Sequence, residues 1–191
     1  MTRKEVIRRL RKHKPKNADD LLRAGVPLAH ISSGAFRHAY KVYNLPLVVK
    51  FPYVDEPYEP GTQDYTRSLQ WSITHSFIEM KSLRRVLRSK SKFRKLRRHM
   101  PKIYHHHPPT GVILMEEYRR PDNAAFRRKV SNIREEVARV FNVDPIGGSS
   151  SIDPGDVQPG NCGVDKRGNV VILDLGLLER RSEPSGPDEL S

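Results

Sequence analysis

Three residues near the C-terminal end of the chain have side chains whose type and spacing suit catalysis: Asp156, Asn161 and Asp174. Asn161 stands five residues after Asp156, and Asp174 lies two residues before Gly176, so the segment reads D-x-x-x-x-N and then D-x-G. Carboxylate and amide oxygens are ligands that magnesium prefers. Phosphoryl transfer needs such ligands, a carboxylate beside the acceptor hydroxyl and a lysine on the phosphates. The alternative is local, because Asp and Asn are common in turns, where they cap the backbone.

Both spacings occur together with Pro159 in the loop and an apolar strand that runs into Asp174. This combination resembles the catalytic loop and the D-F-G element of the protein-kinase-like superfamily. The resemblance covers about residues 31–178 and implies ATP and Mg2+ as cofactors. It also implies that Asp156 is the catalytic carboxylate and that Asn161 and Asp174 are the metal ligands.

A counterpart of the glycine-rich loop precedes these motifs. Residues 31–40, Ile-Ser-Ser-Gly-Ala-Phe-Arg-His-Ala-Tyr, are similar to that loop, which implies that Ser33 and Gly34 cover the phosphates. Ser32 and Arg37 stand where the superfamily usually has glycine. On its own the segment would also suit an ordinary turn between strands.

The phosphate-binding lysine has a counterpart in Lys50. The run Val48-Val49-Lys50 resembles the V-A-I-K strand, which implies that Lys50 binds the α- and β-phosphates. Glu79 is then the expected ion-pair partner, because it is the only acid on the predicted long helix after Asp64. Both residues count as catalytic in this interpretation. The alternatives are a surface lysine at the end of a strand and a solvated glutamate.

The segment 111–118, Gly-Val-Ile-Leu-Met-Glu-Glu-Tyr, resembles the strand and hinge that bind adenine through backbone groups. The resemblance implies that Glu116 and Tyr118 contact the cofactor. Met115 would guard the back of the pocket.

Several departures from the superfamily affect the acceptor side. Gly155 before Asp156 makes the loop more similar to aminoglycoside phosphotransferases than to H-R-D kinases, and Gln158 replaces a lysine of serine/threonine kinases. Fifteen residues follow Gly176, which predicts that an activation segment and the remaining helices of a large lobe are missing. Such a minimal chain resembles the atypical RIO-type kinases and short kinase-like proteins encoded by bacteriophages.

Hydrophobic periodicity predicts the elements that position these residues. Helices are expected over 3–13, from Asn17 to about Gly25, over 66–89 and over 123–141, and strands over 35–43, 47–51, 102–106, 111–116, 162–164 and 170–173. In the helix over 66–89, the expected apolar face contains Leu69, Ile73, Phe77, Met80, Leu83 and Leu87, with Trp71 also in the core.

The order of these elements predicts an α+β protein with a two-lobed protein-kinase-like fold. We expect a small N-lobe sheet with a long helix, and a truncated C-lobe. The expected division is a basic helical extension over 1–25, an N-lobe over 26–118, a C-lobe over 119–178 and a flexible tail over 179–191.

The net charge of +13 is the most unusual feature of the composition. Much of it lies in the first sixteen residues and between Lys81 and Lys102, where there are eleven Lys or Arg and no acid. Such patches attract nucleic acid or acidic proteins, although solvated helix faces are an equal alternative. The single Cys162, the absence of an apolar run of membrane length and the absence of a signal peptide favour a cytoplasmic protein.

Three functions remain open at this stage. The first is an active phosphotransferase or ATPase that acts on an unknown protein or small-molecule acceptor. The second is a pseudokinase scaffold, which the altered glycine loop and Gln158 favour. The third is a protein that binds nucleic acid through its basic patches, and it is compatible with the first. His105-His106-His107 also suggests a metal site, but alternation along a strand turns the middle ring away from its neighbours.

Overall fold

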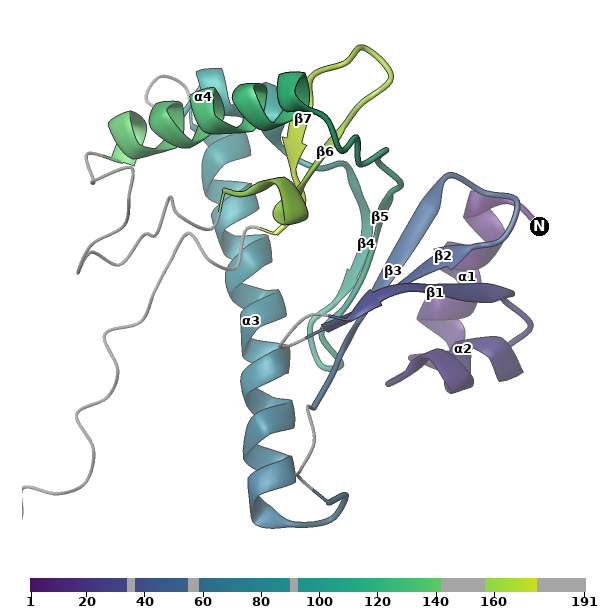
Figure 1. Cartoon of the computed structure of the whole chain (residues 1–191). Helices are drawn as coiled ribbons and strands as arrows, with labels where there is room; N and C mark the ends of the chain where they lie inside the picture. Colours follow the sequence, from purple (N-terminus) through teal and green to yellow (C-terminus); the bar gives the residue numbers. More distant parts are fainter. Residues whose placement is uncertain (34–36, 55–58, 90–92, 142–156, 175–191) are drawn as a thin grey trace, which may run out of the picture. The chain divides into compact units, whose positions relative to one another are not determined.

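The computed structural model describes residues 1–33, 37–54, 59–89, 93–141 and 157–174 (Figure 1). Its helices are α1 (Arg3–His13), α2 (Ala18–Arg23), α3 (Gln63–Arg88) and α4 (Ala124–Phe141), with short 3-10 turns η1 (Lys95–His99) and η3 (Pro159–Asn161). Its strands are β1 (Leu28–Ser33), β2 (Arg37–Val42), β3 (Leu47–Pro52), β4 (Ile103–His107), β5 (Val112–Glu116), β6 (Cys162–Val164) and β7 (Val170–Ile172). The chain is therefore α+β, as predicted.

Two compact units can be distinguished. Unit 1 contains residues 1–80 and 101–119, and unit 2 contains residues 81–100 and 120–191. Residues 81–100 thus fall in unit 2. In the part of the chain that the structure describes, no helix combines the length and the apolarity needed to cross a membrane.

Unit 1 is built on a five-stranded antiparallel sheet with the order β1-β2-β3-β5-β4. Helices α1 and α2 cover one face of this sheet (Figure 1). The core on that face includes Val6 and Leu10 of α1, Val49 and Phe51 of β3, and Leu114 of β5. Because side chains alternate along a strand, the residues between these core positions point to the opposite face. Lys50 is one of them.

The starts of α1 and α2 follow from local capping. Thr2 accepts from the backbone N–H of Glu5, whose carboxylate accepts from the N–H of Thr2, and this reciprocal pair forms a capping box. Asn17 caps α2 by accepting from the N–H of Asp20 at 2.9 Å. Both helices are confirmed close to their predicted ranges. Strand β1 was not predicted. The first predicted strand covered residues 35–43, whereas the sheet already begins at Leu28.

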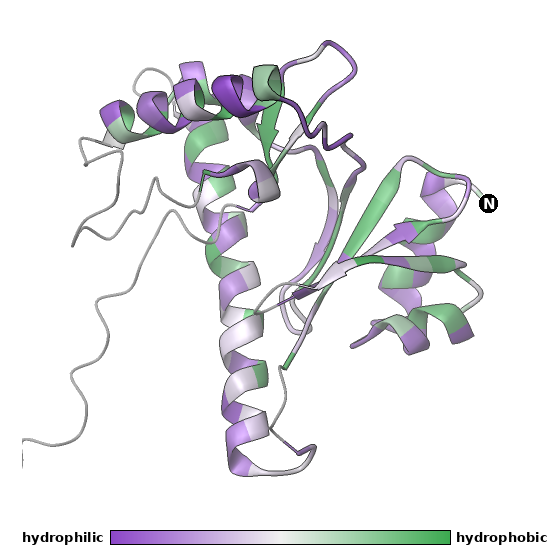
Figure 2. Ribbon diagram, viewed as in Figure 1, coloured by the Kyte–Doolittle hydropathy of each residue, from purple (hydrophilic) through white to green (hydrophobic). Residues whose placement is uncertain are grey.

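The first part of α3 packs on the second face of the sheet through small and polar residues. Ser72 and Ser76 are fully buried, and Ser72 Oγ accepts from the N–H of Tyr53 at 3.1 Å. A Cβ on Gly111 would lie 3.1 Å from the Cα of Ile73, so glycine permits this close approach of sheet and helix. Figure 2 accordingly shows this half of α3 mainly in hydrophilic and neutral colours.

The predicted apolar face of α3 is partly wrong. Phe77 is 52% exposed, and Leu87 and Trp71 are exposed as well. Met80 and Leu83 are buried as predicted, but Glu79 joins them with 1% exposure. The physical reason is that a periodic pattern gives a stripe of residues, whereas the partner surface decides which side of the stripe is covered.

Unit 2 contains α4, the hairpin of β6 and β7, and η1. Asn123 caps α4 by accepting from the N–H of Phe126 at 2.8 Å. The buried face of α4 has the expected helical spacing, with Phe126, Val130, Ile133 and Val137. The hairpin turn is held by Asp165, whose Oδ1 accepts from the N–H groups of Arg167 and Asn169. Both strands and α4 are confirmed where the sequence predicted them.

Candidate functional site

The side chain of Lys50 meets Glu79 in the interior of unit 1. Lys50 Nζ lies 3.3 Å from Glu79 Oε1, and the two residues are 8% and 1% exposed. The ion pair that the sequence predicted between them is therefore present. It forms because strand alternation sends Val49 and Phe51 to the core under α1 and sends Lys50 to the face that carries α3.

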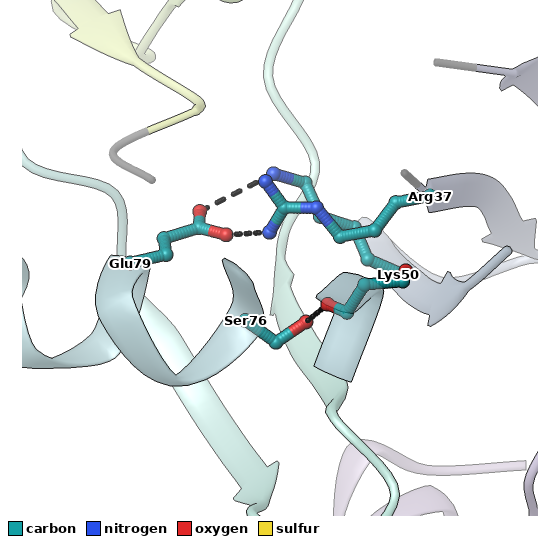
Figure 3. Close-up of polar contacts among 5 residues, drawn as sticks. Arg37, Lys50, Ser76 and Glu79 are labelled. Atoms are coloured by element: carbon teal, nitrogen blue, oxygen red, sulfur yellow. Dashed lines mark hydrogen bonds and ion pairs between the residues drawn. The ribbon is translucent and has the colours of Figure 1, made fainter. Parts of the chain in front are cut away.

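Arg37 also binds Glu79, which the sequence analysis did not predict. Its Nη1 pairs with Glu79 Oε2, and Arg37 is 8% exposed. In Figure 3 the two cations meet the carboxylate at separate oxygens. The register explains the meeting: Ala39 pairs with Lys50 across β2 and β3, and Arg37 shares the face of Ala39. The available signal was the arginine at a position where the superfamily usually has glycine.

The predicted phosphate loop is described only at its edges. Ser33 ends β1, is exposed, and its Oγ lies 3.0 Å from His30 Nε2. Gly34 lies outside the described residues. Ser33 and Arg37 therefore mark the two ends of the segment 34–36.

The predicted adenine-binding residues lie at the end of β5. Met115 is 2% exposed and pairs with Val48, so it shares the sheet face of Lys50. Glu116 and Tyr118 are half-buried. The N–H of Glu116 donates to Lys102 O at 2.9 Å, and the Tyr118 hydroxyl accepts from the N–H of Lys102 at 2.8 Å. The segment 116–118 is thus fixed to the chain just before β4.

The predicted metal ligands lie in unit 2, at one end of the hairpin. Asn161 directly precedes β6 and Asp174 follows β7 after one residue, and both are half-buried. The N–H of Leu173 donates to Asn161 O at 2.7 Å, so the backbone holds the two positions together. One carboxylate and one amide oxygen form a donor set that suits Mg2+. Asp156 lies outside the described residues.

Cys162, next to Asn161, has the structural role that the sequence suggested. It is fully buried and is a free thiol. Burial raises the pKa of the Cys162 thiol to about 12, against a smaller opposite effect from Arg134 and Arg120. A thiol that stays protonated is a poor nucleophile and a poor metal ligand.

The three consecutive histidines lie along β4. Across the described ranges, no three His, Cys, Asp or Glu side chains are grouped in a way that could hold a metal ion. Burial lowers the pKa of His105, with a further contribution from the charge of Arg11. His107 Nδ1 is instead 2.8 Å from Thr110 Oγ1 in the adjoining turn.

The sequence-predicted residues are thus assembled in two sets, each within one unit. Unit 1 brings together Lys50 and Glu79 and adds Arg37, while Met115 lies on the same sheet face. Unit 2 brings Asn161 and Asp174 to one end of a hairpin. No protein-family model matches the chain, and no curated protein matches it.

Proposed function

We propose that this protein is an ATP-dependent, magnesium-using phosphotransferase of the serine/threonine protein-kinase-like type, with a protein or small-molecule acceptor. The observation that carries the proposal is the buried ion pair between Lys50 of β3 and Glu79 of α3. A lysine held in this way is a fixed positive charge suited to phosphate groups.

The burial of this ion pair argues for a function rather than for stability. Removing a lysine and a glutamate from water costs several kcal/mol per ion, and an apolar pair of similar volume is often at least as stable. Ile113 and Met115, which share the sheet face of Lys50, are apolar and buried, so apolar side chains are accommodated on this face. A reaction that needs an immobile cation gives a reason for the charges.

The arrangement of unit 1 supports the same proposal. The resemblance to the protein-kinase-like superfamily implies a small N-lobe sheet with a long helix, and unit 1 has a five-stranded antiparallel sheet against which α3 supplies Glu79. The two-lobed fold with a truncated C-lobe remains part of the proposal. In that interpretation, Asp156 is the catalytic carboxylate, and Asn161 and Asp174 are the metal ligands.

Each predicted role is compatible with the chemistry of its residue. Mg2+, held by Asn161 and Asp174, would neutralise charge on the phosphates. Asp156 would accept the proton of the acceptor hydroxyl. The N–H groups of Glu116 and Glu117 already donate to Lys102 O and Pro46 O. In the proposal, Glu116 and Tyr118 are the residues that contact the cofactor, as the resemblance implies.

The decisive experiment measures binding and turnover separately. ATP binding in the presence of magnesium is followed by calorimetry, and turnover is followed with γ-labelled ATP as released phosphate, autophosphorylation and transfer to added acceptors. Lys50→Ala is expected to weaken ATP binding. Asp174→Asn is expected to reduce turnover by about a thousandfold or more, which is typical for loss of a residue that stabilises the transition state.

A matched control is Lys41→Ala, which removes a lysine from the neighbouring strand. Lys41 Nζ pairs with Glu117 Oε1 at 2.7 Å, but its side chain is 43% exposed. This variant is expected to behave like the wild type. Folded wild-type protein that binds no ATP would overturn the proposal. Binding without any turnover would support the pseudokinase alternative instead.

A second candidate function is binding of nucleic acid through α1, and a specific surface favours it. Lys4, Arg8, Arg11 and Lys12 are exposed on one side of α1 and, with Ile7, line an open hollow of about 600 Å³. The opposite side of α1 carries Val6 and Leu10, which are buried in the core. A membrane-surface helix needs its apolar side free, so this helix suits a charged partner better than a lipid surface.

Salt dependence tests this second function. If α1 binds a phosphate backbone, affinity for a single-stranded RNA of mixed sequence should fall steeply as salt increases, and replacing Arg8 and Arg11 by Gln should reduce the slope by about two charges. Arg9 is the control position, because its guanidinium donates to Ala24 O and thus ties α1 to α2. An affinity that does not depend on salt would exclude this surface.

The phosphotransferase is further proposed to act in the cytoplasm. The support is the buried free thiol of Cys162, since a lone unpaired cysteine suits a reducing compartment.

A further inference from the structure

Arg37 differs from an ordinary surface cation in its position and in its environment. It is the first residue of β2 and lies within residues 31–40, the predicted glycine-rich loop. It is 8% exposed, and its guanidinium pairs with a carboxylate that is 1% exposed. A fully charged guanidinium is therefore held in the interior beside the residue proposed to bind phosphate.

The geometry makes Arg37 and Lys50 partners on one carboxylate. Arg37 pairs with Oε2 of Glu79 and Lys50 pairs with Oε1 (Figure 3). The two cationic groups are thus held by the two oxygens of a single carboxylate. Glu79 fixes both groups, so neither has to be ordered when a ligand arrives.

The donor capacity of the two side chains exceeds what one carboxylate can use. A guanidinium has five N–H donors in a planar fork, and an ammonium group has three. A side chain of either kind can therefore contact more than one acceptor at a time. The three side chains together carry one positive charge, and guanidinium groups recognise phosphate through paired donors.

We propose that Arg37 is a second phosphate-binding residue of the nucleotide site, beside Lys50. This inference rests on the proposed function and adds a residue to it. The arginine stands at a position where the superfamily usually has a glycine of the phosphate loop. A charged side chain therefore supplies donors in a loop that has fewer glycines to bring its backbone N–H groups close to the phosphates.

A structural role is the alternative that the test has to separate. Arg37 joins β2 to α3 through Glu79, so its loss could loosen unit 1 without any contact with a ligand. A structural defect would weaken binding of the whole nucleotide. A lost phosphate contact would weaken only ligands that have phosphates.

The experiment measures the dissociation constants of ATP and of adenosine by calorimetry, with magnesium, for the full chain and three variants. Arg37→Gln removes the charge, and Arg37→Lys keeps the charge but not the planar fork. Arg23→Gln is the matched control, because Arg23 also pairs with a carboxylate, Asp20 at 2.6 Å, but its side chain is 75% exposed. Circular dichroism melting shows whether each variant is folded.

We expect Arg37→Gln to weaken ATP binding by about tenfold to a hundredfold, the usual effect of losing a hydrogen bond to a charged group. Adenosine binding should be unchanged, Arg37→Lys should have an intermediate effect, and Arg23→Gln should have none. If Arg37→Gln does not fold, the same comparison of ATP affinity with adenosine affinity is made for Arg37→Lys.

Two results would overturn the inference. One is a loss of ATP and adenosine affinity in the same proportion, which would make Arg37 a structural residue. The other is unchanged ATP affinity in a folded Arg37 variant. A wild-type protein that binds ATP while its Arg37 variants bind it equally well rejects the inference alone. A folded wild-type protein that binds no ATP rejects the proposed function, and the inference with it.

Discussion

Replacing Glu79 by alanine should destabilise unit 1 far more than the loss of an ordinary surface carboxylate. Glu79 is 1% exposed and neutralises part of the charge of Lys50 and Arg37, whose side chains are 10% and 8% exposed. Its removal leaves two cations in the interior without this carboxylate. Breaking a buried pair by removing one partner costs about 3–5 kcal/mol.

The expected loss of stability can be compared with the loss from breaking an exposed ion pair in the same unit. Glu117 pairs with Lys41 at 2.7 Å, with side chains that are 30% and 43% exposed. Water screens such a pair, so Glu117→Ala should cost at most about 1 kcal/mol. For a chain of this length, the Glu79→Ala change corresponds to a decrease in melting temperature of roughly 6–20 °C.

The assay is urea unfolding followed by far-ultraviolet circular dichroism, for the single variants Glu79→Ala, Lys50→Met and Glu117→Ala and for the double variant Glu79→Ala, Lys50→Met. The double variant removes one of the cations left by Glu79→Ala, so it should be more stable than the sum of the two single changes predicts. If Glu79→Ala is no more destabilising than Glu117→Ala, the claim that this carboxylate holds two buried charges is refuted.

Three further predictions concern other parts of the molecule. The Cys162 thiol, whose pKa burial raises to about 12, should not react with a thiol reagent in the folded protein and should react fully in urea; rapid reaction of folded protein would contradict its burial. Gly111→Ala should lower stability by more than about 1 kcal/mol, because φ is +66° and the new methyl group would lie 2.8 Å from a proline side chain; chemical unfolding measures this, and an unchanged midpoint would contradict it. Burial lowers the pKa of His99 below its ordinary value of 6.5, against weaker opposing effects that include the charge of Glu136, so the unfolded chain binds the proton more readily. Its stabilising effect should be complete above about pH 6.5 and should decrease as pH falls below that value, and His99→Gln should reduce this part of the pH dependence of the urea midpoint.

Local patterns in the sequence determined most of the elements. Alternation predicted β3, β6 and β7, helical spacing predicted α1 and α4, and the side chain of Asn17 predicted the start of α2. These signals succeed because capping and periodicity depend on residues only a few positions apart. The contact between Lys50 and Glu79 came from the resemblance, since their separation of 29 residues follows no local rule.

The sequence pattern did not predict which side of α3 would be covered. The run of apolar residues favoured Phe77 and Leu87, but the structure exposes both and buries Ser72 and Ser76. The close approach of Gly111 explains the choice, because small side chains are needed where the helix backbone lies against the sheet. That approach joins segments far apart in the chain, and periodicity contains no information about it.

The sequence by itself determined that this chain is α+β, and it supplied the prediction of which side chains act on phosphate and magnesium. Only the tertiary structure showed that Arg37 shares Glu79 with Lys50, and that Asn161 and Asp174 lie at the same end of a hairpin. The physical reason is that a residue type fixes what a group can do, whereas strand register and helix packing fix which groups meet. For Arg37, the register of β2 against β3 and the packing of α3 bring its guanidinium to Glu79.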